Sequence, residues 1–270
     1  SISAVEIDKA ELAEQQLVYS RVDRYPVGVF DAVKVRTDPP FDSEYLYVTH
    51  LLDLAPNDVA VFNSPEGLRA INEKIAAQHF SKWTPRSWIG SDLEALLDFA
   101  KSCHFRIVLK PLDLFGGEGI EFVDQRKLSS EQEATAKVKS AWSSLSAGNR
   151  FMMAQELLDE VAEGDMRGFV IVGEPLGAVL RLPATGSLKA NLHAGGKAAE
   201  ATITDADRAM VKELAPFLRE YGILLAGVVV IGGRLTEINV TSPTCFQEYF
   251  RFTGVKLEAV LIEKIEERMS

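Results

Sequence analysis

The sequence predicts an α/β or α+β protein, because helical and extended segments alternate along its 270 residues. Runs rich in β-branched residues, such as 105–110 and 223–231, have the length of strands. Capped segments such as 91–100 and 204–221 repeat their apolar residues with the period of a helix. Hydrophobic residues form 47% of the chain and charged residues 25%, which is typical of a globular protein with a substantial core.

Composition excludes several classes of partner. The formal net charge of −10 argues against nucleic acid and anionic membranes, which attract clustered Lys and Arg. No apolar run approaches the roughly 18 residues that a membrane-spanning helix needs. Cys103 and Cys245 lie far apart without CxxC spacing, and no signal-peptide pattern opens the chain. We therefore expect a cytoplasmic protein whose partners are neither nucleic acid nor membrane.

Helix starts are marked by capping residues. Ser64-Pro65-Glu66 predicts a helix that runs through Asn72-Glu73-Lys74. Segments 91–94 and 129–132 read as capping boxes, and the second helix is expected to end near Gly148. Thr204 to Asp207 opens another helix, with Gly222 at its end. The expected inward residues of these helices and of the C-terminal one are Leu93, Leu96, Leu97, Ala100, Met210, Leu214, Phe217, Tyr221, Leu257, Val260, Leu261 and Ile265.

Glycine and proline divide the strands. The strand 105–110 is followed by Pro111 and a glycine-rich loop, 113–119. Hairpins are predicted around residues 173–175 and around Gly232-Gly233, and 152–157 is expected to be extended. Residues 183–202 show no apolar period, and about 20 such residues in a compact domain indicate a functional lid or disorder.

Two groups of residues are candidates for chemistry. Lys110 stands at a strand end before Gly116 and Gly117, an arrangement that can bind an anion but equally describes a plain hairpin with a solvated lysine. Glu237 and Asn239 lie two apart on a strand, so their side chains share a face with Cα atoms roughly 7 Å apart. Such a pair suits Mg²⁺ bound to phosphates, and it also suits a half-exposed edge strand. Taken alone, Lys74 is more often a surface lysine.

Several motifs together resemble one family, the bacterial glutathione synthetases of the ATP-grasp superfamily. The motifs occur in the order found in that family, at residues 36–42 (RTDPPFD), 72–74 (NEK), 109–113 (LKPLD), 153–155 (MAQ), 191–196 (NLHAGG) and 235–244 (LTEINVTSPT). The resemblance extends from about residue 30 to the C-terminus.

The resemblance implies an ATP-grasp fold with a truncated N-terminal domain, since the family's opening strand–loop–helix unit has no counterpart before Ser1. It divides the chain into a pre-ATP-grasp substrate domain (1–70) and an ATP-grasp domain (71–270). The second comprises a nucleotide-binding subdomain (71–152) and a catalytic subdomain (153–270). Because the family forms tetramers, a homo-oligomer is expected.

The resemblance also assigns roles to residues. Those implied to bind ATP are Lys74, Lys110, Gly116, Gly117, Gln155, Glu156, Leu157, Leu158 and Asp165. Arg167 and Arg181 are implied to be catalytic, and Glu237 and Asn239 to bind Mg²⁺. Residues 183–197 correspond to the family's mobile loop. The residues implied to lie near the peptide substrate are Arg36, Asn191, Gly195, Gly196, Ser242, Pro243 and Thr244.

The implied reaction joins glycine to γ-glutamylcysteine. ATP phosphorylates the cysteinyl carboxylate, and the glycine amine then displaces phosphate, a route that needs charge neutralisation rather than a nucleophilic side chain.

Some positions depart from the family pattern. Val229 occupies the place of a metal-binding aspartate, and Lys189 and Lys197 replace arginines. Two alternatives therefore stay open. One is an ATP-grasp ligase for another carboxylate and amine pair, indicated by bulky residues after Thr244: Phe246, Gln247, Tyr249 and Phe250. The other is a nucleotide-binding protein without turnover.

Overall fold

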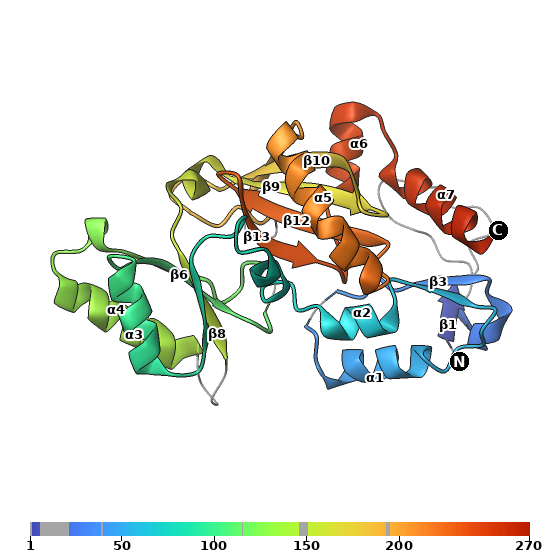
Figure 1. Cartoon of the computed structure of the whole chain (residues 1–270), viewed down its shortest axis with the longest axis horizontal. Helices are drawn as coiled ribbons and strands as arrows, with labels where there is room; N and C mark the ends of the chain where they lie inside the picture. The colour runs from blue at the N-terminus through green and yellow to red at the C-terminus, as the bar shows by residue number, and fades with distance from the viewer. Residues whose placement is uncertain (1, 6–21, 39, 115, 146–150, 193–194) are drawn as a thin grey trace.

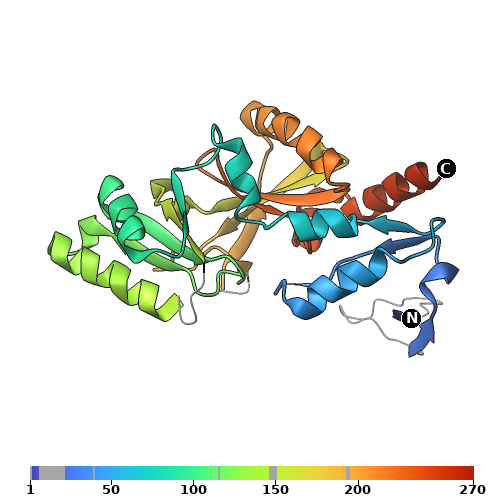
Figure 2. The same ribbon diagram turned by 60° about the horizontal axis from the view of Figure 1, so that its bottom comes forward.

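The computed structural model describes residues 2–5, 22–38, 40–114, 116–145, 151–192 and 195–270. Figures 1 and 2 show an elongated molecule with three parts. The N-terminal elements lie at one end, a four-stranded sheet with two helices lies at the other, and a five-stranded sheet lies between them. Within the described ranges, no helix is both long and apolar enough to span a membrane.

The N-terminal part is built from short elements. β1 pairs with β2 antiparallel, and β3 pairs with β4 parallel. Asp42 caps α1 by accepting a hydrogen bond from Tyr45 N at 3.0 Å. The elements are β1 (Ile2–Val5), β2 (Val22–Tyr25), η1 (Val27–Val29), β3 (Ala32–Lys34), α1 (Ser43–Leu52), β4 (Ala60–Phe62) and α2 (Pro65–Ala70).

The predicted N-terminus of α2 is confirmed, with Ser64 as the cap, but its predicted length is wrong. The helix ends at Ala70, and Ile71 has extended backbone angles. Asn72 Oδ1 accepts hydrogen bonds from the backbone N of Lys74 and of Ile75, both at 3.1 Å. A side chain that binds backbone groups in this way competes with the helix. Glu73 and Lys74 therefore lie in a turn beyond the helix.

The four-stranded sheet has the order β5-β8-β6-β7. Helices α3 and α4 pack against it and bury Leu96, Leu97 and Ala100, as predicted. Both predicted caps are displaced by one residue: Asp92 caps α3, and Ser130 Oγ accepts from Glu133 N at the start of α4. The elements are η2 (Ala76–Phe80), β5 (Ser87–Gly90), α3 (Leu93–Ser102), β6 (Arg106–Pro111), β7 (Glu121–Asp124), η3 (Gln125–Lys127), α4 (Glu131–Leu145) and β8 (Met152–Glu156).

The five-stranded sheet has the order β11-β10-β9-β12-β13. Both predicted hairpins are confirmed, with turns at residues 172–173 and 232–233 in the left-handed region. The predicted capping box at Thr204 and Asp207 opens α5. The elements are η4 (Asp159–Glu163), β9 (Asp165–Ile171), β10 (Glu174–Leu182), β11 (Lys197–Glu200), α5 (Asp205–Glu220), β12 (Leu225–Ile231), β13 (Arg234–Asn239), α6 (Phe246–Thr253) and α7 (Leu257–Met269).

Two features differ from expectation or lie outside the described residues. Residues 197–200, expected to lack structure, form the edge strand β11, in which Glu200 pairs with Val179 of β10. The predicted end of α4 near Gly148 lies outside the described residues, as do four motif or loop positions: Pro39, Phe115, His193 and Ala194.

The segment from Glu73 to Trp83 joins the parts of the molecule. It runs along the outer edge of β13, where Ile238 N donates to Glu73 O at 2.8 Å and Leu235 N donates to Trp83 O at 2.9 Å. These backbone bonds occupy positions that a neighbouring strand would otherwise fill. The turn after α2 is thereby held against the strand that carries the predicted metal ligands.

Candidate active site

A cavity of about 380 Å³ lies between the two larger sheets. It is lined by most of the residues that the sequence assigned to ATP, metal and substrate: Lys74, Lys110, Gly116, Gly117, Gln155, Glu156, Leu157, Leu158, Asp165, Arg167, Arg181, Asn191, Glu237, Asn239, Ser242 and Thr244. Arg36, Pro243, Gly195 and Gly196 do not line it. The fold thus brings together segments that are separated by more than 150 residues in the chain.

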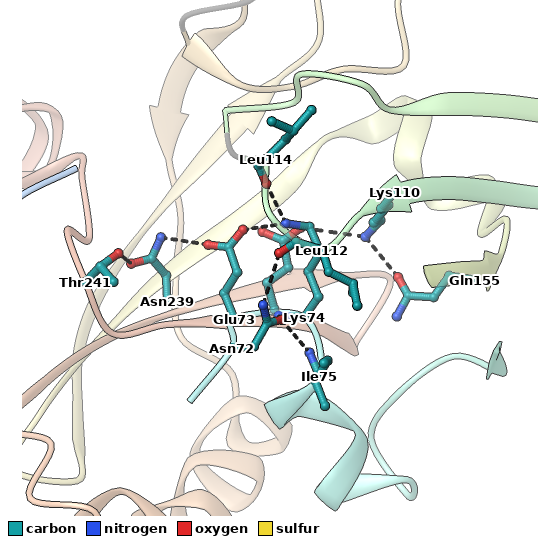
Figure 3. Close-up of polar contacts among 11 residues, drawn as sticks. Asn72, Glu73, Lys74, Ile75, Lys110, Leu112, Leu114, Gln155, Asn239 and Thr241 are labelled. Carbon is teal, nitrogen blue, oxygen red and sulfur yellow. Dashed lines mark hydrogen bonds and ion pairs between the residues drawn. The ribbon is translucent and has the colours of Figure 1, made fainter. Parts of the chain in front are cut away.

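Two buried lysines from different segments, Lys74 and Lys110, enter the cavity (Figure 3). Lys74 Nζ lies 2.7 Å from Glu73 Oε1 and 2.7 Å from Leu114 O. Only 3% of Lys74 is exposed, so the surface-lysine interpretation is wrong. Lys110 Nζ donates to Gln155 Oε1 at 2.9 Å and lies 3.7 Å from Glu237 Oε1. Burial lowers the pKa of Lys110, against the opposing effect of Glu237.

Val229 of β12 pairs with Glu237 of β13 across the hairpin that turns at Gly232-Gly233. Glu237 and Asn239 both line the cavity from β13. Burial alone would raise the pKa of Glu237, but Lys110, Lys74 and the two nearby arginines outweigh it and lower the pKa. The carboxylate is therefore ionised and acceptor-only at neutral pH.

The sequence did not single out Thr236, which also lines the cavity. A β-bulge lies beside it, because Val229 pairs with Glu237 whereas Val230 pairs with Leu235. Such a bulge redirects side chains. Thr236 Oγ1 donates to Val229 O at 3.2 Å, which ties the bulge to β12. No pattern local to the sequence indicates this irregularity.

The two arginines differ in their partners. Arg181 Nε lies 2.6 Å from Asp165 Oδ1; burial opposes its charge, but Asp165 outweighs burial and raises the pKa of Arg181. Arg167 is 5% exposed, and its Nε and Nη1 have no hydrogen-bond partner among the described residues. Burial, followed by the charge of Arg181, lowers the pKa of Arg167. Buried donors without acceptors are costly, so this pair of nitrogens is suited to an anion that enters the cavity.

The sheet register explains why Nε and Nη1 of Arg167 have no acceptor in the part of the chain that the structure describes. Val229 lies between Arg167 of β9 and Glu237 of β13 in one row across three strands. A carboxylate at position 229 would therefore stand directly opposite the arginine. Valine at this position both removes a possible metal ligand and leaves the guanidinium free.

The segment 155–158 closes another side of the cavity. Gln155 is 1% exposed, and its Nε2 has no partner within the described part of the chain. The backbone here is held by Glu156 N donating to Arg86 O and Leu157 N donating to Arg106 O, both at 2.9 Å. The apolar side chains beside it, which sequence reasoning did not identify, are Val108, Ile120, Phe122, Val161 and Ile231. An apolar slot with a few unpaired donors suits a flat heterocycle.

The glycine loop touches the segment predicted to be a lid. Gly117 has φ +85°, and a Cβ there would lie 2.5 Å from Asn191 Oδ1. A side chain at position 117 would therefore separate the two segments. Gly116 has φ +63° and open space around it, so backbone conformation rather than crowding favours glycine there.

The predicted peptide-substrate residues are only partly brought together. Arg36 Nη2 donates to Pro243 O at 2.8 Å, and its guanidinium lies 5.8 Å from the Phe246 ring. Both Arg36 and Pro243 thus lie beside Ser242 and Thr244 at the margin of the cavity. Cys245, which sequence reasoning did not assign to the site, lines the cavity with φ +83°, and burial raises the pKa of its thiol.

Oxygen ligands for a cation gather at one edge of β13. Among the described residues, no group of three or more His, Cys, Asp or Glu could hold a metal ion. The cavity does hold the carboxylates of Glu73 and Glu237 together with the amide of Asn239. Mg²⁺ bound to phosphates needs only one or two carboxylates, so this donor set fits a magnesium–nucleotide complex.

Solved structures of similar fold place the chain in a broad class. The chain superposes on D-cycloserine synthetase with a TM-score of 0.67 and 14% identity, covering 91% of this chain and 86% of that one. It superposes on a D-alanine–D-alanine ligase from Bacillus anthracis, solved with ATP, with a TM-score of 0.60 and 11% identity, covering 89% and 81%. These likenesses show the fold, which is that of the ATP-grasp enzymes.

Sequence comparison identifies the family. Residues 73–254 match the family model of the prokaryotic glutathione synthetase ATP-grasp domain, and residues 1–69 match that of its N-terminal domain. The glutathione synthetase of Nitrosomonas europaea is 39% identical over 252 residues, covering 92% of this chain and 76% of the relative. That of Thermosynechococcus vestitus is 41% identical over 235 residues, covering 86% and 71%. The chain belongs to the prokaryotic glutathione synthetase family, as its motifs predicted.

Proposed function

We propose that this protein ligates glycine to the cysteinyl carboxylate of γ-glutamylcysteine and converts ATP to ADP and phosphate. Family membership supports the substrates. The structural observation that carries the proposal is Arg167, buried in the cavity that Glu237 and Asn239 also line, with two nitrogens that have no partner among the described residues. An enzyme that builds up negative charge on a transferring phosphoryl group needs unpaired donors at that place.

Each side of the cavity has a part in this reaction. Val108, Phe122 and segment 155–158 hold the adenine, with Gln155 Nε2 as a donor to it. Lys74 and Lys110 exchange their present partners for phosphate oxygens. Arg167 and Arg181 neutralise the transferring phosphoryl group while an oxygen of the substrate carboxylate attacks it and ADP leaves. The amine of glycine then attacks the acyl carbon, phosphate departs, and the amine loses a proton.

Mg²⁺ is the metal we propose, held by Glu237 and Asn239. The ion would neutralise phosphate charge and orient the phosphoryl group for transfer. Glu237 is suited to this role because its pKa is lowered, so it needs no deprotonation before it binds a cation.

Water must be excluded, because an acyl phosphate hydrolyses readily. We propose that residues 183–197 close over the site, supported by the contact of Asn191 with the glycine loop. Limited proteolysis tests this lid. Cleavage within 183–197 should slow about tenfold with ATP analogue and γ-glutamylcysteine bound, and unchanged cleavage would contradict it.

A product assay tests the whole proposal. ADP release should require both γ-glutamylcysteine and glycine, and glutathione should form in equal amount. ADP release without either substrate, or none at all, would contradict the proposal and favour a nucleotide-binding protein without turnover.

A second candidate is ligation of a different carboxylate and amine pair. The observation that favours it is the aromatic cluster beside the peptide-substrate residues, in which Phe169 contacts Phe246 and Tyr249 with ring centroids 5.1 Å and 5.7 Å apart. Substituting other amino acids for glycine in the ADP assay distinguishes the two candidates. The predicted domains at 1–70 and 71–270, a cytoplasmic location and a homo-oligomeric state remain parts of this proposal.

A further inference from the structure

Glu73 is a carboxylate that the proposed mechanism leaves without a role. It lies in the turn after α2, and its side chain enters the cavity between two site residues (Figure 3). Glu73 Oε1 lies 2.7 Å from Lys74 Nζ, and Glu73 Oε2 accepts from Asn239 Nδ2 at 3.2 Å. The Glu73 side chain is 17% exposed, so it is partly shielded from water but open to a ligand in the cavity.

The backbone of Glu73 is fixed relative to the predicted metal ligands. Its carbonyl accepts from Ile238 N at 2.8 Å, and Ile238 stands between Glu237 and Asn239 on β13. β13 has β12, with Val229, on one side and the turn with Glu73 on the other. Position 229 offers no carboxylate from the β12 side of β13. The carboxylate of Glu73 instead approaches Glu237 and Asn239 from the other edge of the strand.

We propose that Glu73 supplies the second carboxylate of the divalent-cation site in this protein, beside Glu237 and Asn239. This inference rests on the proposed function, because it requires a metal–nucleotide complex in the cavity. Asn239 would present Oδ1 to the cation, and Lys74 would leave Glu73 for the phosphates. In the same cavity, the nitrogens of Gln155 and Arg167 that lack partners among the described residues independently indicate an acceptor-rich ligand.

The charges in the cavity agree with this exchange. In the structure each acid is adjacent to a lysine: Glu73 to Lys74 at 2.7 Å and Glu237 to Lys110 at 3.7 Å. Phosphate oxygens draw both lysines away. The two carboxylates are then left without cations at short range, and a buried charge without a partner is costly. A divalent ion between them restores the balance.

The test measures metal binding separately from catalysis. Mn²⁺ is titrated into the full chain with a saturating non-hydrolysable ATP analogue, and bound Mn²⁺ is followed by electron paramagnetic resonance. Glu73→Gln should weaken Mn²⁺ binding by about tenfold or more. The matched control is Glu213→Gln, a glutamate that pairs with Lys82 at 2.6 Å outside the cavity, and it should bind Mn²⁺ like the parent.

A positioning role through Lys74 gives a different result. If Glu73 only held the lysine, Glu73→Gln would weaken binding of the analogue in EDTA as much as it weakens Mn²⁺ binding. We expect the affinity in EDTA to change less than about threefold, which is within about 0.7 kcal/mol. Equal losses, or Mn²⁺ binding at the parental level, would overturn the proposal.

Val229→Asp tests the proposal without altering Glu73, should Glu73→Gln fold poorly. If Glu73 already fills the place of the second carboxylate, the added aspartate improves Mn²⁺ affinity only about threefold or less. If Glu73 is not a ligand, the aspartate should improve it about tenfold or more, which would overturn the proposal. The ADP assay on the parent tests the proposed function separately, because a parent that does not ligate would contradict that function. The Mn²⁺ affinities test only whether Glu73 is a metal ligand.

Discussion

The two larger sheets meet at one cavity but contribute different chemistry to it. The four-stranded sheet supplies Lys110 and Gln155, which bond to each other, among apolar side chains such as Val108 and Phe122. The five-stranded sheet supplies polar and charged groups on β10, β9 and β13: Arg181, Asp165, Arg167, Glu237 and Asn239. The first surface is suited to holding a heterocycle and its phosphates, and the second to neutralising charge as it moves.

The two sheets also differ in how well their buried charged side chains are paired. Lys110 of the four-stranded sheet has Gln155 of its own sheet and Glu237 of the other sheet as partners, whereas Arg167 of the five-stranded sheet has two nitrogens without a partner among the described residues. Buried unpaired charge is unfavourable in the absence of ligand. The division predicts that variants in the first sheet change nucleotide affinity and that variants in the second change turnover.

The largest effect is expected for Glu237→Gln. The substitution keeps size and removes the charge that binds the cation, so kcat should fall by about a thousandfold while the chain stays folded. ADP release and thermal melting are measured on the same sample. A variant that melts normally and turns over within a few-fold of the parent would show that Glu237 is not a metal ligand.

Arg167→Met should lower kcat by about a hundredfold or more, because transition-state charge loses its buried donors. The same variant should melt at an equal or higher temperature without ligand, since an unpaired buried cation is removed. KM for ATP is expected to change little. Loss of stability together with loss of activity would mean that the guanidinium has an internal partner.

Lys110→Met probes the other sheet and should raise KM for ATP by about tenfold with a smaller effect on kcat. A charged hydrogen bond to phosphate is lost, while the row from Arg167 to Glu237 keeps its side chains. Kinetic measurements at varied ATP provide the check. A fall in kcat as large as that of Arg167→Met would contradict the proposal that the four-stranded sheet binds nucleotide and the five-stranded sheet supports turnover.

Lys34 belongs to neither sheet and serves as a contrast. Burial, assisted by Arg36, lowers its pKa from 10.5 to about 7 in the folded chain. Below pH 7 both states are protonated and the folded state carries the full cost of burying the charge. Between pH 7 and about 10.5 only the unfolded state keeps its proton, so the cost falls as pH rises.

Lys34→Met should therefore raise the free energy of unfolding by about 2–4 kcal/mol at pH 6 and by little at pH 10. Urea unfolding at both pH values measures this. Lys101→Met, at a half-exposed lysine, is the control and should show no such dependence. An equal gain at both pH values would contradict the assigned pKa shift.

The smallest effect is expected for Val229→Asp. The Mg²⁺ concentration that gives half-maximal ADP release should fall by about threefold or less, because Glu73 already supplies the second carboxylate beside Asn239 in the proposed site. Titrating Mg²⁺ against ADP release for parent and variant provides the measurement. A higher Mg²⁺ requirement in the variant would mean that an acid at position 229 pairs with Arg167 rather than with the cation.

Much of this protein could be determined from its sequence, because the relevant signals are local. Glycines at 232–233 fix a tight turn, and the runs on either side of it then pair as the antiparallel strands β12 and β13. The Thr204 capping box and the apolar face of α3 also depend on residues within a few positions of each other. The family motifs likewise occur in short runs.

Only the tertiary structure decided which residues from distant segments share the cavity. The local pattern predicted that α2 continues through Lys74. Instead, the Asn72 side chain accepts hydrogen bonds from the backbone of Lys74 and Ile75, and Glu73 lies in a turn that faces the cavity. Glu73 then meets Asn239, 166 positions away. A contact of that separation depends on how sheets and connecting segments pack, and no periodicity along the chain records it. The burial of Lys74 and the unpaired nitrogens of Arg167 arise in the same way.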